Sequence, residues 1–290
     1  MKSCISPRRS VLYIPASNGR ALAKARSLPA DALILDLEDA VSPDAKAAAR
    51  LAACAAAGTY AAQEVVIRVN GLDTAWGADD LAAAAASGAD AVLIPKVDGP
   101  ADLLTADAAL RAAGAPAQMG LWVMAETPRG IQQIGAICEA DTALQTVVMG
   151  TNDLAKDLRL PPDPSRLGLL HSLSGCILAA RAQGIDIIDG VFVNLADEAG
   201  FARECEQGRR LGFDGKSLIH PRQIEPANAA FGVTAAELAR SQAIVAAWEA
   251  AAAAGRGIAV LDGQMIEELH AAAARRVLAL HAAIAADTKG

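Results

Sequence analysis

The sequence predicts a protein of the α/β class, a (β/α)8 TIM barrel with a C-terminal helical extension. Eight short apolar runs follow one another along the 290 residues, and a segment with helical pattern separates each run from the next. The runs are continuous rather than alternating in polarity, which is typical of parallel strands buried on both faces. They occupy residues 11–15, 32–39, 65–70, 91–96, 121–127, 146–153, 185–194 and 215–221.

An open, doubly wound sheet is the alternative arrangement for alternating strands and helices. Such a sheet usually carries a Gly-x-Gly-x-x-Gly turn after its first strand, where a dinucleotide binds. No such turn follows residues 11–15. The closed barrel is therefore the favoured architecture.

The sequence divides into a barrel domain, residues 1–224, and an extension, residues 225–290. The extension is expected to contain a helix at 235–254, a Gly-rich loop at 255–264 and a final helix from 265 to about 286. So short a segment cannot bury a core of its own. We expect it to act as a lid that packs on the barrel or covers the active site of a neighbouring subunit.

Composition narrows the range of partners. The formal net charge is −7 and no block of Lys or Arg occurs, so a nucleic-acid or anionic membrane surface is not expected. The five cysteines, from Cys4 to Cys205, show no Cys-x-x-Cys spacing and predict neither a disulfide scaffold nor a zinc site. No apolar run reaches the ~18 residues of a membrane span. These features favour a cytoplasmic enzyme that binds a small metabolite.

Polar residues stand where nearly every predicted strand ends. In (β/α)8 enzymes the loops after the strands converge at this face and carry the chemistry. A single polar residue there is often only a solvated or salt-bridged rim residue, but their recurrence favours an active site. The residues are Asp36, Glu38, Asp39, Arg68, Asn70, Lys96, Glu126, Asn152, Asp153, Lys216 and His220.

Glu126 and Asp153 form a candidate metal site. They are 27 residues apart, about one strand–helix–strand repeat, so we expect them on adjacent strands at one mouth. Two carboxylates without a nearby His or Cys suit Mg²⁺, completed by water and substrate oxygens. The alternative is that one of them pairs structurally with Arg68 or Lys96.

The chain resembles the citrate lyase β-subunit-like branch of the HpcH/HpaI aldolase family, which includes malyl-CoA and citramalyl-CoA lyases. The resemblance covers nearly the whole chain, in one order of motifs. These are RSVLYIPASNGR (9–20), DALILDLEDAV (31–41), VIRVNGLDT (66–74), LIPKV (93–97), AET (125–127), GTNDLAKDL (150–158), LGFDGKSLIHPRQI (211–224) and VLDGQMIE (260–267).

The resemblance implies a Mg²⁺-dependent barrel that acts on a 3-hydroxyacyl thioester, in homotrimers or multiples of trimers. It places the metal ligands on Glu126 and Asp153, the substrate-polarising arginine on Arg68 and the catalytic acid on Asp262. Two departures surround Asp262, since Gln264 and Glu267 stand where the family commonly has Lys and Asp. The acidic group around the metal falls on Asp36, Glu38 and Asp39.

The implied reaction is a retro-Claisen cleavage or its reverse. A 3-hydroxy-carboxyacyl-CoA such as citramalyl-CoA or malyl-CoA would yield acetyl-CoA and a 2-oxo acid, with Arg68 and Asp262 as catalytic residues. Arg20 and Lys24, spaced i, i+4 at the start of the first helix, are candidates for the CoA phosphates or else a solvated helix face. The alternative function is the β subunit of a citrate lyase that receives its thioester from an acyl-carrier protein. The acyl group and the direction of the reaction stay open.

Overall fold

The computed structural model describes residues 6–287 of the chain. Its contacts divide the chain into two compact units. One spans Arg8–Phe231, and the other contains, among the described residues, 6–7 and 232–287. The predicted division at residue 224 and the covering role of the extension stay predictions.

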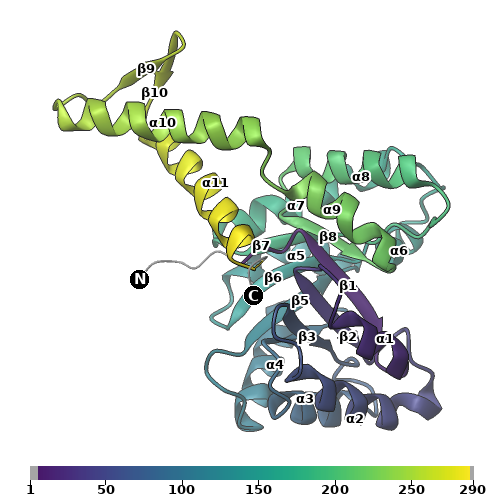
Figure 1. Cartoon of the computed structure of the whole chain (residues 1–290). Coiled ribbons are helices and arrows are strands. Elements are labelled where there is room, and N and C mark those ends of the chain that lie inside the picture. The colour runs from purple at the N-terminus through teal and green to yellow at the C-terminus, as the bar shows by residue number, and fades with distance from the viewer. Residues whose placement is uncertain (1–5, 288–290) are drawn as a thin grey trace. The chain divides into compact units, whose positions relative to one another are not determined.

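The first unit is a closed barrel of eight parallel strands in sequential order (Figure 1). Strand β1 pairs with β2 on one side and with β8 on the other, so the predicted barrel is confirmed and an open sheet is excluded. The strands are β1 (Ser10–Pro15), β2 (Ala32–Asp36), β3 (Glu64–Arg68), β4 (Ala91–Ile94), β5 (Gly120–Ala125), β6 (Leu144–Met149), β7 (Asp186–Asp189) and β8 (Gly215–Leu218).

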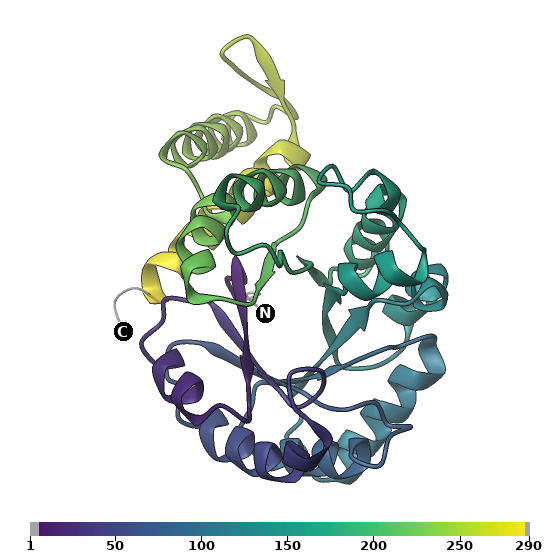
Figure 2. The same ribbon diagram turned by 90° about the vertical axis from the view of Figure 1, so that its right-hand side faces the viewer.

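Helices surround the strands, as Figure 2 shows with the ring of strands at the centre. Most connections return the chain to the next parallel strand through one helix, which is the expected βαβ crossover. The helices are α1 (Gly19–Ala25), α2 (Lys46–Ala57), α3 (Gly77–Ala85), α4 (Pro100–Ala112), α5 (Pro128–Glu139), α6 (Thr151–Asp157), α7 (Leu170–Ala182), α8 (Glu198–Leu211) and α9 (Ile224–Phe231).

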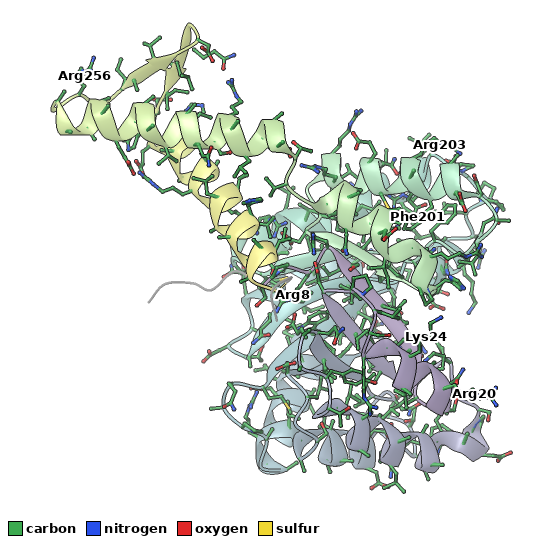
Figure 3. All side chains as sticks on the ribbon, viewed as in Figure 1. Arg8, Arg20, Lys24, Phe201, Arg203 and Arg256 are labelled. Atoms are coloured by element: carbon green, nitrogen blue, oxygen red, sulfur yellow. The ribbon has the colours of Figure 1, made fainter. Side chains whose placement is uncertain are left out.

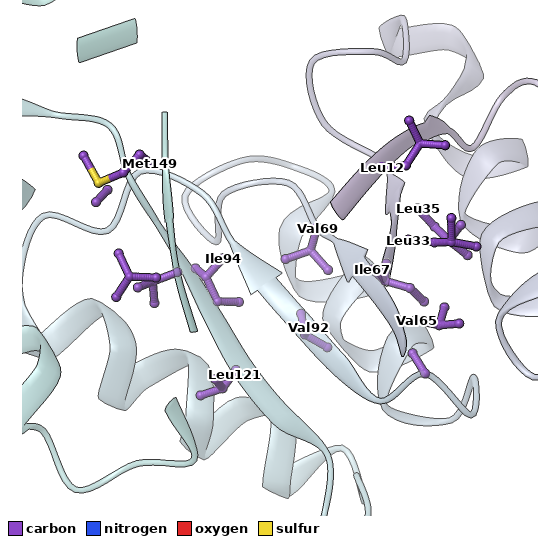
Figure 4. Packing of buried hydrophobic residues seen from close by; sticks show 14 of the residues in the cluster. Leu12, Leu33, Leu35, Val65, Ile67, Val69, Val92, Ile94, Leu121 and Met149 are labelled. Atoms are coloured by element: carbon purple, nitrogen blue, oxygen red, sulfur yellow. The ribbon is translucent and has the colours of Figure 1, made fainter. Parts of the chain in front are cut away.

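Alternate residues of strands β1 to β7 enter two separate apolar clusters. Side chains such as Leu33, Ile67 and Val92 pack between the sheet and the helices (Figure 4). Those of the other parity fill the barrel interior, among them Ile34 and Trp122. Because the interior is packed, an open space for a substrate is left at the strand ends and their loops.

Several strands end earlier than the sequence suggested. The run 146–153 stops at Met149, because Gly150 begins a turn into α6 and carries Asn152 and Asp153 into that helix. The run 185–194 stops at Asp189 in the same way, before a loop that starts at Gly190. The apolar runs thus continue beyond the hydrogen-bonded strands into the loops at the C-terminal end of the barrel.

The second unit contains a β-hairpin that the sequence analysis missed. Helices α10 (Ala235–Ala253) and α11 (Glu268–Asp287) match the predicted helices, but β9 (Ala259–Leu261) and β10 (Gln264–Ile266) pair antiparallel between them. The expectation of a loop at 255–264 and of a helix from 265 was therefore wrong. Asp262 and Gly263 form the two-residue turn with φ of 50° and 74°, the conformation that Asp-Gly favours in tight hairpins.

Across residues 6–287, none of the helices is both long and apolar enough for a membrane crossing. Cys54, Cys138, Cys176 and Cys205 are free thiols. Cys4 lies outside the described residues.

Candidate active site

A cavity of ≈ 410 Å³ opens at the C-terminal ends of the barrel strands. It brings together five of the predicted site residues, which come from β2, β3, β5 and α6 and from the loops that follow. These five are Asp36, Asp39, Arg68, Glu126 and Asp153. Residues up to 117 positions apart in the chain thus face one space only because the barrel closes.

Glu126 lies at the base of this site, with only 1% of its surface exposed. It follows β5 directly, and the pairing of Ala125 with Met149 sets it beside Gly150 at the end of β6. A Cβ on Gly150 would lie 2.6 Å from Glu126 Oε2, so glycine leaves the room that the carboxylate occupies. The Lys96 backbone N–H donates to Glu126 Oε1 at 2.8 Å, which fixes one oxygen.

The ionised form of Glu126 is disfavoured at its buried position. Burial, together with the nearby charges of Glu38 and Asp153, raises the pKa of Glu126 to about 7, against the opposing effects of the Lys96 amide and Arg68. Asp153 lies half-buried in the first turn of α6 and lines the same cavity. Two carboxylates that face one cavity in this way need a positive charge between them to stay ionised together.

Arg68, at the end of β3, is held by carboxylates. Its Nε and Nη2 donate to the two oxygens of Asp36, each at 2.7 Å, and its Nη1 lies 2.9 Å from Glu38 Oε2. Asp36 and Arg68 are direct partners in the β2–β3 register, which explains the bidentate pair. Asp39 is exposed and lies farther away, at 3.6 Å from Nη1. The acidic residues at the end of β2 and just after it therefore orient the guanidinium.

Lys96 links the carboxylates around Arg68 to Glu126. Its Nζ donates to Glu38 Oε1 at 2.8 Å, while its backbone N–H holds Glu126. Its φ of 51° is in the left-handed region, which a side chain other than glycine adopts at a cost. Such local strain is typical of residues whose position matters to a site. Lys96 and Glu38 line a second space of ≈ 1020 Å³ beside the first.

The residues present fit a magnesium ion. Glu126 and Asp153 offer hard oxygen ligands, and a cation between them would offset the cost of burying ionised Glu126, the cause that raises its pKa most. Asp36 is committed to Arg68 and is not available as a ligand. Within residues 6–287, no group of three or more His, Cys, Asp or Glu side chains is arranged to hold a metal. Two protein carboxylates, with water and substrate oxygens, are thus what this site can supply.

Other predicted residues lie on separate elements. Asp262 is exposed in the hairpin turn of the second unit. Arg20 and Lys24 are exposed on α1, as Figure 3 shows. This helix begins four residues after Pro15, which lines the cavity, and Asn18 Oδ1 caps it by accepting from the Ala21 N–H.

The cavity also includes residues that the sequence analysis did not single out. Tyr13, Met124 and Met149 lie inside predicted strands, and their apolar neighbours made them read as core residues. Gly150 precedes α6, whereas the sequence analysis placed it inside the predicted strand 146–153 and gave it no role in the site. For Tyr13, the alternation of side chains along the strand could have indicated its position. Val11 and Tyr13 are two residues apart and therefore share the face that points into the barrel.

The fold and the site define a barrel enzyme with a buried and a half-buried carboxylate and an adjacent arginine at the strand ends. The chain belongs to the HpcH/HpaI aldolase/citrate lyase family, whose profile matches residues 9–221. A second profile, a C–C bond lyase of the TIM-barrel fold, matches residues 168–284. The predicted family and the predicted class, a citrate lyase β-like carbon–carbon lyase, are confirmed.

Relatives match over most of their length. The (3S)-malyl-CoA thioesterase of Cereibacter sphaeroides strain KD131 is 49% identical over 282 residues, which are 97% of this chain and 96% of that protein. Citrate lyase subunit beta of Escherichia coli K12 is 37% identical over 267 residues, 90% of this chain and 88% of the relative. The structure of CitE from Mycobacterium tuberculosis with magnesium, acetoacetate and coenzyme A matches with a TM-score of 0.73 at 28% identity, covering 94% of this chain and 97% of that one.

Proposed function

We propose that this chain is a magnesium-dependent enzyme for a 3-hydroxy-carboxyacyl-CoA thioester of the malyl-CoA type. The observation that carries the proposal is the cavity in which the buried Glu126 and the half-buried Asp153 face a space also lined by Arg68. The malyl-CoA thioesterase relative supports this acyl group, and the CitE complex supports magnesium and coenzyme A as ligands.

Glu126 and Asp153 would hold the ion in this proposal. When bound, Mg²⁺ supplies a Lewis acid and a template for the substrate's carboxylate and adjacent hydroxyl oxygen. Arg68 adds a fixed positive charge beside the reacting oxygens, and its orientation is set by the bidentate pair with Asp36. Because Glu126 and Arg68 are almost fully buried, their charges act more strongly than they would at the surface.

Two reactions of the thioester would both need the positive charge that Mg²⁺ and Arg68 supply. In carbon–carbon cleavage the substrate hydroxyl loses its proton and the bond between C2 and C3 breaks, which releases glyoxylate. The thioester carbonyl takes up the charge of the enolate, which then gains a proton and becomes acetyl-CoA. In hydrolysis, water adds to the same carbonyl, and its oxygen again gains charge before CoA leaves. We propose hydrolysis to malate and CoA as the first candidate, because the 49%-identical relative carries that name. Cleavage to acetyl-CoA and glyoxylate is the second, favoured by the lyase family itself.

Arg20 and Lys24 would bind the phosphates of CoA. Both are exposed on α1, which follows the cavity-lining Pro15 closely in the chain. A cluster of two cations one helical turn apart is suited to a diphosphate. In this proposal the acyl group lies inside the cavity, and the nucleotide lies over the loops after β1.

Asp262 would exchange the proton at the thioester end, acting on the site of an adjacent chain in a homotrimer or a multiple of trimers. Its turn is exposed, and the hairpin around it leaves large apolar side chains uncovered: Ile258 is 50%, Val260 70% and Met265 55% exposed. Apolar surface of this kind is typical of a segment that another surface covers. This assembly is also what the family resemblance implies.

Product analysis tests the proposal. The purified chain is incubated with malyl-CoA, citramalyl-CoA, citryl-CoA and a citryl-loaded acyl-carrier protein, each with Mg²⁺ or with EDTA, and the acids and CoA species are quantified. We expect Mg²⁺-dependent turnover of malyl-CoA, with malate plus free CoA marking hydrolysis and glyoxylate plus acetyl-CoA marking cleavage. Turnover of citryl groups on an acyl-carrier protein, with no activity on free CoA esters, would instead identify a citrate lyase subunit.

A further inference from the structure

Tyr13 is the aromatic side chain of the active-site cavity. On β1, Leu12 and Ile14 pack toward the helices, whereas Val11 and Tyr13 face the barrel interior. Tyr13 lines the cavity together with Arg68 and Glu126. Its side chain therefore faces the space where a substrate would bind, and not the apolar cluster between the sheet and the helices.

The contacts of Tyr13 fix its ring but leave its hydroxyl weakly used. The Arg68 guanidinium carbon lies 4.9 Å from the ring centroid, a cation–π distance that orients the aromatic plane. The hydroxyl donates to Met124 Sδ at 3.3 Å. A thioether is a weak acceptor, so a carboxylate oxygen would be a much better partner for the same proton.

Arg68 itself has few donors left for a substrate. Asp36 takes its Nε and Nη2, and Glu38 lies at its Nη1. Arg68 therefore supplies charge, and a directional hydrogen bond must come from elsewhere. Ser217, another hydroxyl of the cavity, already donates to the Asp189 carbonyl at 2.9 Å. Burial raises the pKa of Tyr13 well above its usual range, against the influence of Arg68, so the hydroxyl keeps its proton.

We propose that the Tyr13 hydroxyl donates a hydrogen bond to the distal carboxylate of the substrate, the one that malate retains after hydrolysis and glyoxylate retains after cleavage. Tyr13 lies two residues before the end of β1, beside Met124 and on the inner side of the cavity. A bulky CoA group must enter from the loops, so the end of the acyl chain remote from CoA reaches this depth. The assignment rests on the proposed function and names a residue that selects dicarboxylic over monocarboxylic acyl groups.

The test compares Tyr13→Phe with Tyr60→Phe. The first variant keeps the ring on Arg68 and removes the hydroxyl. The second removes a hydroxyl that donates to the Leu22 carbonyl at 2.9 Å, outside the cavity lining. Calorimetry in Mg²⁺ measures the Kd of glyoxylate, which keeps the carboxylate, and of acetyl-CoA, which lacks it.

We expect Tyr13→Phe to weaken glyoxylate about tenfold or more, as for the loss of a hydrogen bond to a charged group, and to change acetyl-CoA less than about twofold. Tyr60→Phe should change neither. Unchanged glyoxylate binding in Tyr13→Phe, an equal loss for acetyl-CoA, or no glyoxylate binding by the wild type would each overturn the assignment. Tyr13-dependent glyoxylate binding without turnover of malyl-CoA would remove the proposed reaction and leave the role of Tyr13 standing.

Discussion

Replacing Glu126 by Gln is expected to lower kcat/KM by about a thousandfold or more while making the metal-free protein more stable. Gln keeps the shape and can still accept from the Lys96 N–H, but it removes the anionic ligand on which the metal depends. Activity should fall while stability rises, because the negative charge of Glu126 binds the metal but destabilises the folded protein when no metal is bound.

The gain in stability follows from the pKa of Glu126, which burial raises from 4.5 to about 7. The folded state then binds more protons than the unfolded chain between these two values, so wild-type stability falls as pH rises through this window. At pH 8 the metal-free variant should exceed the wild type by about 1–3 kcal/mol in free energy of unfolding. Mg²⁺ should stabilise the wild type and leave Glu126→Gln unchanged.

Denaturant unfolding at pH 5 and pH 8, with and without Mg²⁺, measures these differences. Glu139→Gln is the matched control, since Glu139 is an exposed carboxylate at the end of the same β5–α5 segment. A Glu126→Gln variant that stays active, or that is destabilised equally at both pH values, would contradict the proposed role of this carboxylate.

Replacing Asp262 by Asn should lower kcat by about a hundredfold to ten-thousandfold, because a general acid–base group contributes on that order. Asn still fits the turn at φ 50°, since Asn tolerates the left-handed conformation, so the hairpin should persist. Binding of Mg²⁺ should be unaffected. Activity assays and metal titration of the single variant separate these effects.

Mixing variants tests whether Asp262 acts on a neighbouring chain. Glu126→Gln and Asp262→Asn subunits are allowed to exchange, with exchange verified by a mass tag. If Asp262 acts in trans, mixed trimers contain sites with an intact metal pair and an intact Asp262, and part of the wild-type rate returns. Verified exchange with no recovery would assign Asp262 to its own chain or to no catalytic role.

The barrel could be predicted because all of its strands are buried on both faces. Continuous runs such as 91–96 and 121–127 are typical of that environment, and their regular spacing predicts parallel crossovers. Because these runs are apolar throughout, they do not indicate which side chains face the barrel interior and which face the helices. Tyr13 therefore read as core, although it lines the cavity.

The candidate site was predictable where position along the strand was sufficient. Glu126 and Asp153 meet because they follow adjacent strands. The pairing of Asp36 with Arg68 depends on register, which strand positions alone did not fix. The hairpin was missed because its strands have three residues each, although Asp262-Gly263 between apolar residues was a usable turn signal.

A crystal structure with Mg²⁺ and glyoxylate tests the central claim most directly, namely that Glu126 and Asp153 form the metal site of a thioester-processing enzyme. The account predicts one octahedral ion bound by an oxygen of each carboxylate at about 2.1 Å, with glyoxylate and water in the remaining positions. An ion bound elsewhere, or glyoxylate in the cavity with no ion between Glu126 and Asp153, would contradict it.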